Sequence, residues 1–321
     1  DSAQPLMGVA QDFRPFQQRP YASLPARPRR PHSYFQHPGK RLAMHSEAFG
    51  ELDIHWLDVG SGPPLLLIHG LMTTSYSWRY MLDLLSPHYR LIIPDLPGCG
   101  RSDKPLSHSF RPGSFARWLG EFQRELGIEG CACVANSMGG YLAMHQALNQ
   151  PGAYSHLLNI HSPGWPEARI YALNLALQVP GAAWGLNRFI RLDPLRWAHA
   201  NTHYYDEGLK SLEEAEAYGL PLASWKGAES LIRFLAETMH PRDMEHFVAA
   251  LRQRAARKQA FPSPMTLIYA RQDPMVPPEF GHNFSRLLPG TPLIWLEQSS
   301  HFPQVDTPEA LSTLILEILN K

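Results

Sequence analysis

The feature that most constrains the fold is a serine on a tight corner between a strand-like and a helix-like segment. Residues 134–140 read Val-Ala-Asn-Ser-Met-Gly-Gly, with Ser137 at the corner. Residues 131–134 before it are apolar, as in a buried parallel strand, and apolar residues after it recur at helical spacing. A strand that enters a helix through one residue strains that residue, so its neighbours two positions away must be small. Ala135 and Gly139 meet this need, although a serine at an ordinary helix N-terminus would give a similar heptad.

Short apolar or alternating segments recur along the chain with helical patterns between them. Candidate strands lie at residues 43–49, 52–57, 65–68, 91–93, 131–134, 156–160, 266–269 and 293–296. The first two favour an antiparallel hairpin, and the alternation that follows predicts an α/β fold with a doubly wound, mostly parallel eight-stranded sheet. Among the helices, one is well specified over residues 114–127, where Ser114 can cap the start and Gly127 can close the end.

The alternation is interrupted once, between residues 163 and 240, where helical patterns follow one another without a buried strand. These patterns cover residues 168–178, 184–191, 209–218 and 224–239. We expect a helical cap over the carboxyl ends of the strands, where ligands bind in such sheets. Four of the eight tryptophans fall here: Trp165, Trp184, Trp197 and Trp225. On the inner side of the cap they would favour an apolar substrate, and otherwise they form the core of the cap itself.

The N-terminal segment differs in composition from the rest of the chain. Residues 1–41 hold seven prolines and seven basic residues, which predicts an irregular arm that either packs on the body through its aromatic side chains or is a disordered tail. We therefore expect three parts: an arm (1–41), a core (42–162 and 241–321) and a cap (163–240).

Composition excludes several function classes. Lysine plus arginine equals aspartate plus glutamate at 29 each, so no overall charge attracts nucleic acid or acidic lipid. No apolar run of 18 residues occurs, so we expect no integral membrane segment, and we expect neither a metal nor a cofactor. The three cysteines, Cys99, Cys131 and Cys133, are expected to be buried free thiols.

We expect a cytoplasmic rather than a secreted protein, but the chain begins at Asp1 and its native N-terminus could be missing. The oligomeric state does not follow from the sequence.

The corner at Ser137 resembles the nucleophile elbow of the α/β-hydrolase fold family, with Ala135 in place of the usual first glycine. The resemblance implies that the Met138 N–H faces the oxyanion that forms during acyl transfer. A second donor is expected in His69-Gly70-Leu71, which follows the first buried parallel strand, and the N–H of Leu71 is the candidate.

An aspartate and a histidine follow the last two candidate strands. A serine hydroxyl is a poor nucleophile near neutral pH, so it needs an imidazole base and a carboxylate that orients the imidazole. Asp273 comes directly after a strand, and His301 lies 28 residues later. The order Ser137, Asp273, His301 is the order that this fold requires. At the end of the sixth strand, an alternative acid position in some relatives, the chain offers His161 and no acid, and Glu279, Glu297 and Asp306 are expected to face solvent.

Residues 95–105 and the tetrapeptide at 301–304 resemble the cap-bearing branch that includes epoxide hydrolases, haloalkane dehalogenases and carbon-carbon bond hydrolases. In this branch Asp95 is expected to hold a turn rather than to react. Serine at 137 argues against dehalogenase and epoxide hydrolase chemistry, which uses a carboxylate nucleophile in those relatives. Carbon-carbon bond hydrolases usually hold a substrate carboxylate with a cap arginine, for which Arg188 and Arg191 are candidates, although surface salt bridging is the expected role for each.

Three functions follow as hypotheses. The first is a carboxylesterase-like serine hydrolase that cleaves an ester or similar acyl bond of a largely apolar small molecule through an acyl-enzyme. The second is a carbon-carbon bond hydrolase of ring-fission-type diketone acids, which would use the same triad. The third is a non-catalytic small-molecule receptor, which would need neither a base nor a group to orient it.

Overall fold

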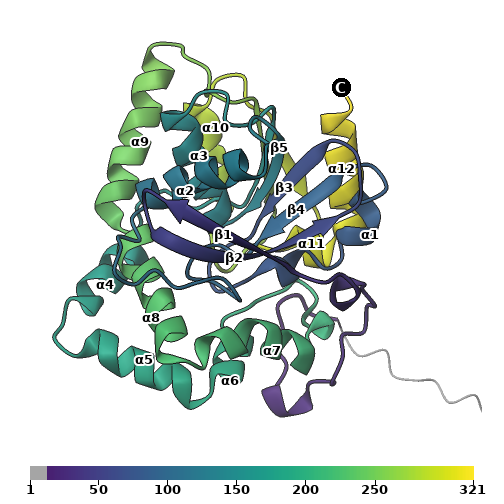
Figure 1. Cartoon of the computed structure of the whole chain (residues 1–321), viewed down its shortest axis with the longest axis vertical. Helices are drawn as coiled ribbons and strands as arrows, with labels where there is room; N and C mark the ends of the chain where they lie inside the picture. Colours follow the sequence, from purple (N-terminus) through teal and green to yellow (C-terminus); the bar gives the residue numbers. More distant parts are fainter. Residues whose placement is uncertain (1–12) are drawn as a thin grey trace, which may run out of the picture.

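The structure, a computed structural model, describes residues 13–321 and is centred on one eight-stranded sheet (Figure 1). The strands are β1 (Lys40–Ser46), β2 (Gly50–Val59), β3 (Pro64–Ile68), β4 (Arg90–Pro94), β5 (Ala132–Asn136), β6 (Leu157–Ile160), β7 (Met265–Ala270) and β8 (Leu293–Leu296). Their spatial order is β1-β2-β4-β3-β5-β6-β7-β8. Strand β2 is antiparallel to β1 and β4, and every other pair is parallel. The predicted doubly wound, mostly parallel sheet is confirmed.

Helices cover both faces of the sheet and build two separate apolar cores. The larger core contains side chains of α2 (Pro112–Glu125), α3 (Met138–Asn149), α9 (Pro241–Ala256) and α10 (Glu279–Leu287). The second core contains side chains of α1 (Leu82–Leu85) and α12 (Pro308–Leu319), and the short α11 (Pro303–Asp306) packs beside α12. Because the interiors of β3 to β7 are buried on both faces, these central strands read as continuous apolar runs. Between residues 13 and 321, no helix combines the length and apolar character needed to cross a membrane.

The best-specified helix of the sequence begins two residues before the predicted start. Helix α2 begins at Pro112, so Ser114 lies inside the first turn and is not the cap. Proline suits the first helical position because its fixed φ matches the helix and its missing N–H would have no partner there. The predicted end is correct, because Gly127 follows the helix with a φ of 65°.

Five α-helices lie between β6 and α9 and gather at one end of the molecule (Figure 1). They are α4 (Ala168–Leu177), α5 (Ala182–Leu192), α6 (Pro194–Ala200), α7 (Leu212–Gly219) and α8 (Trp225–Arg233), and α8 continues into a π-helical turn (Phe234–Thr238). Helix α6 was not predicted. Side chains of α5 and α8 form an apolar cluster against which Leu71 and Met72 of the core pack. The inserted helices therefore cover the loop that follows β3.

The tryptophans of the inserted helices do not line an inner surface as a group. Trp184 is 66% exposed and Trp225 is 50% exposed, whereas Trp197 packs on the cluster of α5 and α8 and Trp165 packs on the larger core. The expectation that these four side chains lie on the inner side of the cap or form its core is thus wrong for Trp184 and Trp225. The tryptophans carry no argument for an apolar substrate.

The described part of the arm, residues 13–39, lies along α7 and the rim of the sheet (Figure 1). Its backbone accepts hydrogen bonds from α7, since the Leu212 N–H donates to Pro25 O at 2.8 Å. The Tyr34 hydroxyl lies 2.8 Å from Ser75 Oγ in the core. Residues 13–39 therefore pack on the core and on α7, which agrees with the first of the two alternatives for the arm, a packed segment rather than a disordered tail. Residues 1–12 lie outside the described residues.

A buried ion pair joins the core to the inserted helices. Arg79, which follows the 3₁₀ turn Ser75–Trp78, has a fully buried side chain and donates to Glu214 Oε1 of α7 at 2.7 Å. Its guanidinium also lies over the rings of Tyr76 and Tyr80, at 4.2 and 4.7 Å from the ring centroids. Neither partner was identified in the sequence, because 135 residues separate them.

Replacement of Arg79 by methionine is expected to lower the free energy of unfolding by about 3 to 5 kcal/mol, because Glu214 is left buried and unpaired. Urea unfolding measures the loss. The double variant Arg79→Met/Glu214→Leu is the control, since removing both charges should restore much of the stability. A single variant as stable as the wild type would mean that the pair does not tie α7 to the core.

Candidate active site

Ser137 occupies a strained corner between β5 and α3, as the sequence predicted. Its backbone angles are φ 56° and ψ −125°, and α3 begins with the next residue, Met138. Such a conformation is costly for a residue with a side chain and is typical of functional sites. Gly139 explains why the second neighbour must be small, because a Cβ there would lie 2.5 Å from His69 O. The elbow is packed directly against the loop after β3.

The loop after β3 is fixed by a buried histidine that the sequence reasoning did not assign. The His69 ring accepts from the Leu96 N–H at Nε2, so its Nδ1–H donates to Gly70 O at 2.8 Å. Thr73 Oγ1 donates to the same carbonyl. Burial lowers the pKa of His69, which suits this neutral form. In a trans peptide the N–H lies opposite the carbonyl, so the Leu71 N–H points away from both donors.

This loop also lies directly beside the serine. A Cβ added to Gly70 would lie 2.8 Å from Ser137 Cβ and 3.4 Å from Ser137 Oγ. Leu71, the next residue, is half-buried, and Met138 is fully buried at the first position of α3, where helical N–H groups have no intrahelical acceptor. The two predicted oxyanion donors are thus carried by two backbone segments that contact each other.

Asp273 and His301, 28 residues apart, are brought together. Asp273 Oδ1 accepts from the backbone N–H groups of Met275 and Val276 at 2.7 and 3.0 Å, and Asp273 Oδ2 lies 2.6 Å from His301 Nδ1. Burial opposes ionisation of this carboxyl, but the imidazoles that face it hold its pKa well below the usual range. The aspartate is therefore an anion fixed on both oxygens, and it orients the His301 ring through Nδ1.

The loop that carries His301 is tied to the residue before the serine. Asn136 Nδ2 donates to His301 O at 2.9 Å, and Gln304 Nε2 donates to Asn136 Oδ1 at 3.0 Å. Within residues 13–321, Ser137 Oγ makes no hydrogen bond to the His301 ring. Catalytic hydrogen bonds are often longer in the free enzyme than in the substrate complex. We expect the bond between Ser137 Oγ and His301 to form in that complex.

A second histidine faces the same aspartate, which the sequence reasoning missed. His161 follows β6, is fully buried, and has its Nδ1 2.8 Å from Asp273 Oδ2. The sequence showed that β6 ends in a histidine rather than an acid, but it did not show that this side chain and Asp273 converge. The signal available was position, because β6 and β7 are adjacent parallel strands and their carboxyl ends meet.

His161, Asp273 and His301 together form a group of the kind that binds metal ions, with one ligand atom from each within 4.8 Å of the others. The donor set fits a metal poorly. The Ala270 N–H donates to His161 Nε2 at 2.5 Å, so the proton of a neutral His161 sits on Nδ1, the atom that would have to bind the ion.

The remaining residues named from the sequence fall into structural roles. Asp95 accepts from the N–H groups of Ser75 and Arg101 and so holds its turn together, as expected. Asp306 was expected to face solvent, and this is wrong: it is half-buried and accepts from the backbone N–H groups of Tyr205 and Asp206. Its carboxylate anchors the segment before α7 to the core.

The two candidate arginines of the cap make no contact with the catalytic candidates within the described chain. Arg188 is exposed, and Arg191 donates to Asn187 on the same helix. The three cysteines are buried and free, as expected.

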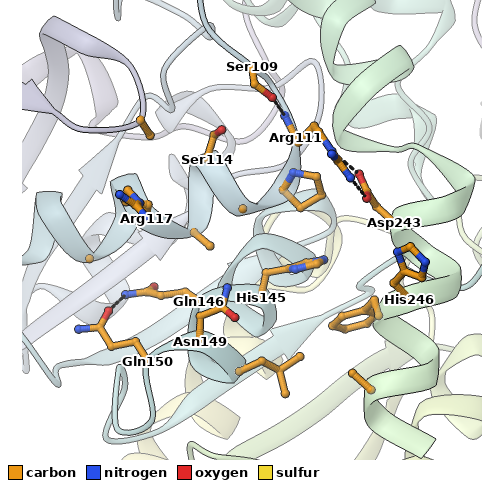
Figure 2. A pocket seen from close by; sticks show the side chains of 18 of the residues that line it. Ser109, Arg111, Ser114, Arg117, His145, Gln146, Asn149, Gln150, Asp243 and His246 are labelled. Atoms are coloured by element: carbon orange, nitrogen blue, oxygen red, sulfur yellow. Dashed lines mark hydrogen bonds and ion pairs between the residues drawn. The ribbon is translucent and has the colours of Figure 1, made fainter.

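A large hollow on the described surface lies elsewhere. It has a volume of about 1320 Å³ and is lined by polar side chains of α2, α3 and α9, with Arg111 paired to Asp243 (Figure 2). None of the predicted catalytic residues lines it. A smaller cavity lies between Met72, the turn after β4 and the apolar side chains of α8, including Leu231. This cavity has a volume of about 20 Å³ and, because Met72 follows Leu71 directly, it lies near the loop that carries the second predicted oxyanion donor.

Comparison with known proteins agrees with this architecture. The sequence pattern of the alpha/beta hydrolase fold matches residues 63–308. The chain is 26% identical over 278 residues to a pimeloyl-[acyl-carrier protein] methyl ester esterase of Vibrio vulnificus, covering 84% of this chain and 99% of the relative. It is also 26% identical over 275 residues to haloalkane dehalogenase 2 of Mycobacterium bovis, covering 82% of this chain and 90% of the relative.

Solved structures of similar fold include a meta-cleavage product hydrolase and an epoxide hydrolase. The first has a TM-score of 0.65 and 21% identity and covers 88% of this chain and 98% of its own. The second has a TM-score of 0.71 and 18% identity and covers 87% of this chain and 98% of its own. At these identities the structural matches speak for the fold alone.

Proposed function

Because the chain belongs to the α/β-hydrolase fold family and is a hydrolase of that fold, we propose that it is a serine esterase. Its substrate is an ester or a similar acyl compound of a largely apolar small molecule. The reaction proceeds through an acyl-enzyme on Ser137, with His301 as the base and Asp273 as the group that orients it.

The chemistry follows from the roles of these groups. His301 Nε2 takes the proton of Ser137 Oγ as the hydroxyl attacks the acyl carbon, and the Leu71 and Met138 N–H groups bind the oxyanion. His301 then gives the proton to the departing alcohol. Water attacks the acyl-enzyme by the same route and releases the acid, with Asp273 holding the His301 Nδ1–H throughout.

The observation that carries the proposal is the hydrogen bond from the Asn136 side chain to the backbone of His301. One side chain, adjacent to the strained Ser137, holds the carbonyl of His301, whose ring is already bound to Asp273. A receptor would need neither this connection nor a charged carboxylate buried behind the ring. This arrangement therefore supports catalysis over a non-catalytic role.

An apolar substrate is supported by the apolar side chains near Leu71, which surround a cavity with room for about one water in this structure. Its walls include Met72, Leu222, Leu231 and Phe234, with the last three on the inserted helices. We accordingly propose the division into arm (1–41), core (42–162 and 241–321) and cap (163–240), with the cap covering the acyl group. Carbon-carbon bond hydrolysis is the second candidate, favoured by the sequence of the elbow, but Arg188 and Arg191 do not supply an arginine for the carboxylate of its substrate.

A fluorophosphonate probe tests the proposal directly. The folded protein is expected to form one covalent adduct on Ser137, located by peptide mass spectrometry, because only an activated serine is phosphonylated rapidly. An aryl ester assayed beside a vinylogous diketone acid separates the two hydrolase candidates, and the ester should be turned over faster. Folded protein that forms no adduct would support the receptor instead.

A further inference from the structure

The carboxylate of Asp273 faces two imidazoles, and the proposed triad uses only one of them. We propose that His161 is a positioning residue, which donates its Nδ1–H toward Asp273 Oδ2 and so holds the carboxylate in place for His301. The inference rests on the proposed function, since it concerns the same catalytic group. It adds a fourth side chain to the machinery, from the end of β6.

The protonation of His161 is set by its backbone neighbour on β7. The Ala270 N–H donates to His161 Nε2 at 2.5 Å, so Nε2 is an acceptor. Burial lowers the pKa of His161, which keeps the ring neutral with its single proton on Nδ1. That atom is 2.8 Å from Asp273 Oδ2. Because Nε2 accepts from Ala270 and Nδ1 carries the proton, His161 has no free lone pair with which to serve as the base for Ser137.

The contact is short in distance, but within residues 13–321 His161 Nδ1 makes no hydrogen bond of good geometry to Asp273 or to any other acceptor. A buried N–H without a well-aligned acceptor is rare and calls for an explanation. Here Asp273 Oδ2 is shared with His301 Nδ1, the closer of the two donors at 2.6 Å. The neutral N–H of His161 thus faces an anion that the second imidazole also engages.

With His161 counted, the carboxylate meets four N–H groups. Met275 and Val276 hold Oδ1 through their backbone, and the two histidines face Oδ2. A carboxylate has about four lone-pair sites, so these groups restrict the directions in which Asp273 can rotate. Among other titratable groups, Tyr269 packs on the His161 ring at 4.8 Å between centroids, and its hydroxyl donates to Ser162 O. Backbone N–H groups and the ring N–H of a neutral imidazole contribute to holding the anion without carrying a charge.

The test compares His161→Asn with His161→Leu, two side chains of nearly the same shape. Asparagine keeps an N–H donor near the position of Nδ1 and tolerates the φ of 50° at this residue. Leucine keeps no donor. Both remove the acceptor for Ala270, so that loss cancels in the comparison. If the leucine variant does not fold, His161→Phe replaces it, because phenylalanine keeps a ring but has no donor.

We expect the leucine variant to lose about 10- to 100-fold in kcat with little change in KM, because Asp273 is held less rigidly. The acidic limb of its kcat/KM profile should move to higher pH, since a less neutralised carboxylate favours the protonated, inactive form of His301. The asparagine variant should keep the wild-type limb and most of kcat.

A leucine or phenylalanine variant with wild-type kcat and pH profile would overturn the role of His161, as would an asparagine variant as impaired as the leucine variant. Urea unfolding of each variant separates loss of fold from loss of positioning. Failure of the underlying proposal is recognised separately, because it would appear as wild-type activity after removal of the Ser137 hydroxyl.

Discussion

Replacement of Ser137 by alanine is expected to lower kcat for an ester substrate by about 10⁴- to 10⁶-fold. The acyl-enzyme cannot form without the hydroxyl, and the oxyanion donors alone give only residual catalysis. Substrate binding should change little, because Ser137 is small and 7% exposed. Steady-state kinetics give kcat, and equilibrium binding of a non-hydrolysed ester analogue to the variant gives Kd.

Ser312→Ala is the matched control for this variant. Ser312 is a buried serine on α12, on the opposite face of the sheet from α3, and lies in no part of the proposed machinery. Its variant should keep the wild-type kcat within a few-fold. Hydrolysis by the Ser137 variant at a rate near that of the wild type would remove the nucleophile from the mechanism and with it the acyl-enzyme.

Local patterns in the sequence were sufficient for the sheet and for the elbow. Buried strands read as apolar runs, and their carboxyl ends mark the positions of Ser137 and Asp273, because parallel strands end at one edge. The small residues around Ser137 reported a backbone constraint, which the φ of 56° and the close approach of Gly139 to His69 O bear out. These features depend on residues close in sequence or on the periodicity of single elements.

Features that depend on distant pairs could not be predicted in this way. Arg79 and Glu214 are 135 residues apart, and each alone resembles a surface charge. Asp306 carries the same carboxylate as any exposed acid, and only the docking of Tyr205 against it fixes its role. His161 was identified as occupying an acid position, but its tautomer depends on the Ala270 N–H of the neighbouring strand. Such contacts exist only after the elements have packed.

Replacement of Asp273 by asparagine is expected to lower kcat by about 10⁴-fold, for a reason specific to this site. Two backbone N–H groups hold Oδ1, so an asparagine must keep its carbonyl oxygen there and turn its NH₂ toward His301. A donor facing Nδ1 moves the proton of a neutral His301 to Nε2. The ring would then have no lone pair available for the proton of Ser137.

Asp306→Asn serves as the control, because Asp306 lies five residues from His301 and binds backbone N–H groups of the cap rather than the imidazole. This variant should have a lower free energy of unfolding than the wild type but a kcat close to the wild-type value. In the proposed mechanism Asp273 acts on the tautomer of the base, whereas Asp306 attaches the cap, so the two variants separate these two functions of a carboxylate. An Asp273→Asn variant that retained more than a tenth of the wild-type kcat would mean that another group orients His301. His161 could not be that group, because its neutral N–H is a donor and offers no acceptor to the Nδ1–H of His301.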